Sequence, residues 1–110
     1  MILISLVLAA DWTPAPTVSP YDQCMGKAQS QSDKTSCAGE DADRQTRRLD
    51  DFVTEQIARG KAGLEVDQRK WLGLLSTKCP DTEGNLVDRM NHSLCVIAET
   101  KKRATALGAP

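Results

Sequence analysis

The sequence contains 110 residues with a formal net charge of −1, and 40% of its residues are hydrophobic. This length is enough for one domain with a modest core, since the chain has only two tryptophans, one tyrosine and one phenylalanine. A nearly neutral chain lacks the basic field that nucleic-acid binding requires, so a nucleic-acid partner is disfavoured.

The first ten residues, MILISLVLAA, form an uncharged apolar run that ends in small residues. A bilayer span needs about twenty apolar residues, so this run is too short to be a membrane helix. It is typical of a secretory signal cleaved after Ala9 or Ala10. No Lys or Arg occurs before Lys27, so the usual positive start is missing, and a strand or helix packed in the core is the alternative. We expect a periplasmic or secreted protein; no cysteine directly follows the run, so no stable membrane anchor is expected.

The segment after this run, DWTPAPTVSP at 11–20, contains three prolines. Proline fixes φ and has no N–H to donate, which disfavours regular structure. We therefore expect residues 11–23 to form a Pro-rich linker or tail.

Three helical patterns follow this linker. Ser30 and Asp33 form a weak N-cap signature, and small or apolar residues then recur at steps of mostly three and four until the stop signals at Gly60 and Gly63. A second pattern covers about 64–78 and a third about 85–107. No segment alternates with a period of two for long enough to indicate a strand. The sequence predicts an all-α fold, a small bundle of about three helices.

Large apolar residues on these helical stripes give the expected core, namely Leu49, Phe52, Trp71 and Leu94. Aromatic residues on an apolar stripe usually pack inside a protein, and an interface role for Phe52 and Trp71 is the alternative.

Four cysteines, Cys24, Cys37, Cys79 and Cys95, predict two disulfides in a small exported domain. If the first helix starts near Ser30, Cys37 lies about 10 Å into it, and the six residues before Ser30, if extended, can reach back that far. Cys95 lies about 15 Å into the third helix, a distance that the turn at 80–85 can cover. Geometry thus favours the sequential pairing. Zinc is the alternative, but the spacings lack the close cysteine pairs of structural zinc sites.

Three segments carry a family resemblance. They are AQSQSDKTSC at 28–37, QRKW at 68–71 followed by Cys79, and Cys95, Thr100, Arg103 and Leu107 in the pattern C-x4-T-x2-R-x3-L. Together with Leu49, these residues resemble the LprI-type lysozyme-inhibitor family of small exported bacterial domains with four cysteines. The resemblance implies a helical domain over residues 24–107 whose named activity is inhibition of lysozyme.

The polar positions of the family pattern match less well than the scaffold positions. Val53 stands where the family usually has Tyr, and Leu75 and Ser76 stand where it usually has an Arg-Asp pair. The resemblance therefore implies the fold more strongly than the function.

Nothing in the sequence indicates an enzyme. His92 is the only histidine, and no Ser or Cys lies in a local nucleophile signature, so we expect no catalytic site, no metal site and no cofactor.

Carboxylates are frequent between residues 40 and 55, and Asp50 and Asp51 are the candidate partner-binding residues. Lysozymes are usually basic, and charge complementarity speeds association. Three arginines are interleaved with these acids, so a solvated helix face with i,i+3 and i,i+4 pairs is the alternative.

Two classes of function follow. The first is an exported protein-binding domain, with a lysozyme as the partner that the resemblance implies and occlusion of the enzyme as its mode of action. The second is a structural or accessory cell-envelope domain that binds another partner, or peptidoglycan fragments, without inhibiting anything.

Overall fold

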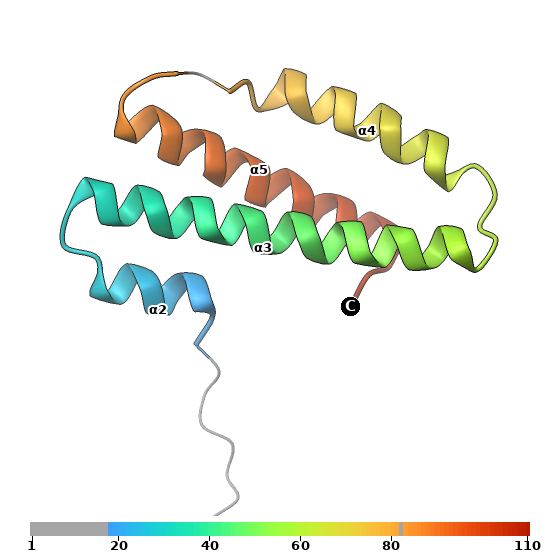
Figure 1. The fold of residues 1–110 in the computed structure, drawn as a ribbon, viewed down its shortest axis with the longest axis horizontal. Helices are drawn as coiled ribbons and strands as arrows, with labels where there is room; N and C mark the ends of the chain where they lie inside the picture. Colours follow the sequence, from blue (N-terminus) through green and yellow to red (C-terminus); the bar gives the residue numbers. More distant parts are fainter. Residues whose placement is uncertain (1–17, 82) are drawn as a thin grey trace, which may run out of the picture.

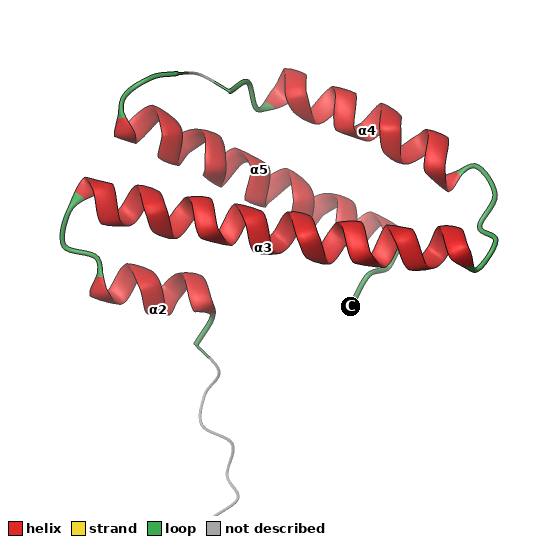
Figure 2. Cartoon of the chain, in the orientation of Figure 1, coloured by secondary structure: helices red, strands yellow, loops and turns green. Residues whose placement is uncertain are grey.

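A computed structural model describes residues 18–81 and 83–110. Within these ranges the chain forms four helices and no strand, as Figures 1 and 2 show. The helices are α2 (Pro20–Lys27), α3 (Gln31–Ala58), α4 (Leu64–Lys78) and α5 (Leu86–Leu107). The all-α class and the two disulfides are confirmed, but the expected count of about three helices is one short helix too low. The expected signal at 1–10, and the linker up to residue 17, lie outside the described residues.

The short helix α2 is the element that the sequence did not predict, because the residues before Ser30 were expected to be extended. Pro20 begins the helix, where a missing N–H costs nothing, and Ser19 Oγ accepts a hydrogen bond from Asp22 N at 3.1 Å. A helix of eight residues is too short to be stable alone. The disulfide between Cys24 and Cys37 fastens α2 to α3.

The long helix α3 begins at a complete capping box. Ser30 Oγ accepts a hydrogen bond from Asp33 N at 3.0 Å, and the Asp33 carboxylate accepts one from Ser30 N and one from Gln29 N. These hydrogen bonds, with that from Gln29 the strongest, hold the pKa of the Asp33 carboxyl below its ordinary value. At the other end, Gly60 and Gly63 have φ of 86° and 78°, a left-handed conformation that lets the chain turn into α4.

The helices pack around α3, which lies in the middle of Figure 1. α5 runs alongside α3 in the same direction, while α2 and α4 run in the opposite direction on its two sides. α4 and the loop that follows it therefore return the chain to the start of α3, where α5 begins (Figure 1). The disulfide between Cys79 and Cys95 joins the end of α4 to the middle of α5.

The main hydrophobic cluster lies where α3, α4 and the end of α5 meet. Leu49, Val53 and Leu64 are buried at its centre, and the partly buried residues packed against them are Ile57, Trp71, Ala104 and Leu107. Of the four expected core residues, Leu49 is only 3% exposed. Phe52, Trp71 and Leu94 are partly buried.

Candidate functional site

The two candidate partner-binding residues, Asp50 and Asp51, are both exposed but point in different directions. Successive residues of a helix are rotated by about 100°. Asp51 accordingly lines a groove beside α2, whereas Asp50 does not. The adjacent carboxylates therefore belong to two different surfaces, whereas the sequence analysis treated them as one candidate binding site.

Asp50 shares one side of α3 with Asp43, which precedes it by seven residues, close to two whole turns. Glu40, ten residues before Asp50, lies at the edge of this side, about 80° around the helix. We call Glu40, Asp43 and Asp50 the acidic stripe. All three are exposed, and none has an ion-pair partner within 4.0 Å among the residues that the structure describes. Arg47 lies on the same side and is equally unpaired. The stripe thus presents more negative than positive charge to solvent.

Ion pairs within α3 involve other residues. Arg44 Nη2 lies 3.2 Å from Asp41 Oδ1, and Arg59 Nη2 lies 2.7 Å from Glu55 Oε1. The alternative of a helix face neutralised by its own arginines therefore holds for these two pairs, while Arg47 lies beside the acidic stripe without a carboxylate within 4.0 Å in the described part of the chain.

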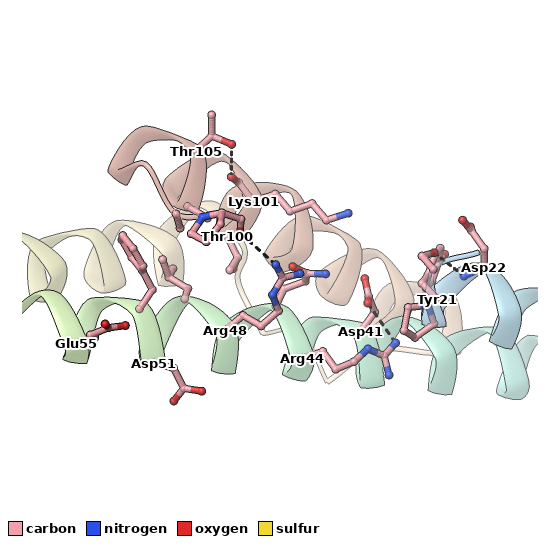
Figure 3. A pocket seen from close by; sticks show the side chains of 18 residues that line it. Tyr21, Asp22, Asp41, Arg44, Arg48, Asp51, Glu55, Thr100, Lys101 and Thr105 are labelled. Carbon is pink, nitrogen blue, oxygen red and sulfur yellow. Dashed lines mark hydrogen bonds and ion pairs between the residues drawn. The ribbon is translucent and has the colours of Figure 1, made fainter. Parts of the chain in front are cut away.

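A groove of about 970 Å³ lies between the start of α2, the middle of α3 and the end of α5. Figure 3 shows the side chains that line it. Leu49, Phe52 and Ala104 supply apolar surface, while Arg48 of α3 and Lys101 of α5 extend into the space between the two helices. The groove therefore combines apolar walls with charged groups of both signs, because four carboxylates also line it, namely those of Asp22, Asp41, Asp51 and Glu55. Apolar walls with a few polar groups are the usual composition of a ligand site.

Two polar side-chain atoms at the groove have no hydrogen-bond partner among residues 18–81 and 83–110. Thr100 is 2% exposed and its Oγ1 is unpaired, and Arg44 Nε is buried without an acceptor although Arg44 Nη2 binds Asp41. A buried unpaired polar atom costs about 1–3 kcal/mol. The Thr100 hydroxyl and the Arg44 Nε–H group, both buried at the groove, are therefore available for further hydrogen bonds.

A second polar cluster, at the other side of α5, joins α4 to α5. The Arg103 guanidinium donates from Nε to Gln68 Oε1 at 3.0 Å, binds Asp67 Oδ2 at 2.9 Å and lies 5.8 Å from the centre of the Trp71 ring. Gln68 is 7% exposed and the Arg103 side chain 13%. We call Gln68, Trp71 and Arg103 the α4–α5 clamp, in which Arg103 is bound to Gln68 and lies over the Trp71 ring.

His92, the only histidine, serves a local structural contact. Its Nδ1 lies 3.1 Å from the Pro80 carbonyl oxygen, beside the Cys79–Cys95 disulfide. This contact fastens the α4–α5 loop to α5. Within residues 18–81 and 83–110, no cluster of three or more His, Cys, Asp or Glu side chains that could hold a metal is found.

The family model described as "Lysozyme inhibitor LprI" matches residues 24–107, from the first cysteine to the end of α5. The chain belongs to this family. LprI is described as an inhibitor of an enzyme and not as an enzyme. No curated protein and no solved structure matches the chain.

The residues that carried the resemblance to LprI are mainly structural. The four cysteines form disulfides, and Gln68, Trp71 and Arg103 form the α4–α5 clamp. Leu49 and Thr100 are both buried and also line the groove. No helix among the described residues is long and apolar enough to cross a membrane.

Sequence reasoning did not identify the groove. Its α2 wall requires a helix that was expected to be an extended segment, and its cations, Arg48 and Lys101, lie 53 positions apart in the chain. The signal that could have indicated this wall was the sequence Ser19-Pro20-Tyr21-Asp22, an N-cap followed by proline and an acidic first turn.

Proposed function

We propose that this LprI protein is an exported inhibitor of lysozyme that binds the basic enzyme through the acidic stripe of α3 and occludes its cleft. Membership of a family described as lysozyme inhibitors is the observation that carries the proposal. The three unpaired carboxylates of the stripe support the choice of surface, because a partner cation would not have to displace an ion pair already present.

The scaffold suits such a surface. α3 has 28 residues and is held by α2 through a disulfide on one side and by α5 along its length. A surface on a rigid helix loses little conformational freedom on binding, which favours affinity. Long helices also project their charges in a fixed register, so a partner meets the stripe in a single arrangement.

Export is part of the proposal. Two disulfides close loops with sequence separations of 13 and 16 residues, and such crosslinks persist in oxidising compartments. Lysozyme acts on the cell wall, so its inhibitor must be located in the periplasm or outside the cell. The proposed partner is a protein, and no cofactor is required.

The first experiment measures inhibition itself. Lysis of a cell-wall suspension by lysozyme is followed as the loss of turbidity, with and without the purified, disulfide-bonded protein. We expect the wild type to slow lysis by a basic lysozyme in proportion to its concentration. No effect on several classes of lysozyme would refute inhibition and favour the accessory cell-envelope domain.

The second experiment locates the surface. Asp50→Lys combined with Asp51→Lys should weaken inhibition mainly through slower association, and added salt should weaken the wild type more than the double variant. Among the single variants, Asp50→Lys should account for most of the loss, because Asp51 faces the groove. Association rates measured by stopped-flow fluorescence over a series of salt concentrations test both expectations.

A matched pair of charge reversals controls for net charge. Asp81→Lys with Glu83→Lys makes the same change in the exposed loop between α4 and α5. We expect this variant to retain most of its inhibition. If it loses inhibition while the Asp50 and Asp51 variant does not, the interface lies on the loop and the assignment to the acidic stripe is wrong.

A further inference from the structure

The groove between α2, α3 and α5 already holds a short piece of peptide chain. After α5, Gly108 turns the backbone with φ of 76°, and Ala109 N donates to Ala104 O at 2.9 Å. Ala109 and Pro110 then lie along the groove, where Arg48 Nη2 donates to the Pro110 main-chain oxygen at 3.2 Å. An arginine of α3 therefore binds the backbone of a non-helical segment within the groove.

Two cations of the groove have no Asp or Glu partner. Arg44 is paired with Asp41, and Glu55 is paired with Arg59 outside the groove. In contrast, Arg48 and Lys101 have no Asp or Glu carboxylate within 4.0 Å in the described part of the chain, and Arg48 is bound only to the Pro110 oxygen at 3.2 Å. Asp22 and Asp51 also line the groove and have no ion pair in the described part of the chain. In Figure 3 Asp22 lies at the α2 end of the groove, and the Asp51 carboxylate points to the side of α3 away from α5.

The remaining lining suits apolar side chains of an extended segment. Leu49, Phe52 and Ala104 form the apolar part, and Tyr21 from α2 adds an aromatic ring. The unpaired hydroxyl of Thr100, which is 98% buried, is a further group that a peptide amide could satisfy after a rotation of the side chain.

We propose that this groove is a binding site for an extended peptide that carries a carboxylate, which Arg48 and Lys101 hold at the position where Pro110 now meets Arg48. The apolar side chains of the peptide pack on Leu49 and Phe52, and Ala109 and Pro110 give way to it. A guanidinium and an ammonium reaching into one groove recognise a carboxylate by charge-assisted hydrogen bonds. This site is separate from the acidic stripe, so it does not depend on lysozyme inhibition.

The test uses the full chain labelled with ¹⁵N and the peptide acetyl-Ala-Leu-Ala-Pro with a free carboxylate. Amide chemical shifts are followed during titration. We expect saturable shifts at Ala109, Arg48, Thr100 and Lys101, and at least tenfold weaker binding of the same peptide with its carboxylate amidated. Sodium acetate at the same concentrations should leave these amides unchanged, since acetate lacks the apolar residues.

Neighbouring residues of the same type provide matched variants. Arg48→Gln with Lys101→Gln should weaken peptide binding at least tenfold, corresponding to the loss of about 1.4 kcal/mol. Arg47→Gln with Lys102→Gln removes the same two charges from side chains that do not line the groove, and should bind the peptide like the wild type.

Several results would overturn the proposal. Equal affinity for the carboxylate and amide peptides, or an equal loss of peptide affinity in the two double variants, would show that Arg48 and Lys101 do not hold a carboxylate. Chemical-shift changes confined to α4 would place the peptide elsewhere, and equal shifts with acetate would make the groove a site for a bare anion. If the same amides shift with protein concentration alone, the groove is a contact between two copies of this chain and the peptide site is also refuted.

Discussion

Replacement of Trp71 by alanine tests how α4 is attached to the rest of the fold. Trp71 is partly buried, packs against the cluster of Leu49, Val53 and Leu64, and lies under the Arg103 guanidinium at 5.8 Å. Loss of a fully buried tryptophan costs about 3–5 kcal/mol, so a partly buried one should cost about 2 kcal/mol. The cation–π contact adds about 0.5–1 kcal/mol. We expect Trp71→Ala to lower the free energy of unfolding by about 2–3 kcal/mol.

Urea denaturation, followed by circular dichroism with the disulfides intact, measures this change. With a slope of about 1.5 kcal/mol/M for a domain of this size, the midpoint should fall by about 1.3–2 M. Leu72→Ala is the matched control on the same helix, because Leu72 is 46% exposed and its loss should cost no more than about 0.5 kcal/mol. Equal midpoint shifts for the two variants would refute the packing described for Trp71. Trp71 would then be a candidate residue for binding a partner.

Three further changes probe other parts of the scaffold. Arg103→Met leaves the buried Gln68 oxygen without its donor and should cost about 2 kcal/mol in the same urea experiment; a cost below about 0.5 kcal/mol would show that the clamp is not needed. Because its pKa is lower in the folded state, the Asp33 carboxylate stabilises the fold. This contribution to the free energy of unfolding is complete above the ordinary pKa of 3.8 and is lost as the pH falls through the lower, folded-state pKa. On acidification from about pH 5 to pH 2, the thermal midpoint of Asp33→Asn should therefore fall less than that of the wild type. An equal fall in the two proteins would contradict this. Cys24→Ser with Cys37→Ser should cost about 3 kcal/mol and reduce the helical circular dichroism signal as α2 unfolds, whereas an unchanged signal would show that α2 holds without the bridge.

The long helices were predictable because their signals are local. The Ser30 and Asp33 pair gave the start of α3, and Gly60 and Gly63 gave the turn into α4. The sequential disulfides were predictable from chain length, and both are present. The geometric argument for Cys24 used an extended segment where the structure has α2, so the pairing was right although one of its premises was wrong.

The candidate site was less predictable because it depends on how helices far apart in the sequence meet. The density of carboxylates in the sequence did not reveal that Asp50 and Asp51 face different surfaces, although adjacent residues of a helix are rotated by about 100°. Phe52 was expected in the core, but it is partly buried and lines the groove, since α2 and α5 leave space beside it. Proline-rich composition led residues up to 23 to be interpreted as a linker, whereas Pro20 is the first residue of α2.

The motif residues at the contact of α4 with α5 serve the scaffold. Arg103 donates to Gln68, binds Asp67 and lies over the Trp71 ring, so these contacts are made inside the fold. The two surfaces proposed above for recognition rely instead on exposed charges, such as Asp50 in the acidic stripe and Arg48 and Lys101 in the groove. These charges can change without disturbing the disulfides or the clamp. Inhibition is therefore best tested by changing exposed charges, since a change in the clamp would also destabilise the domain.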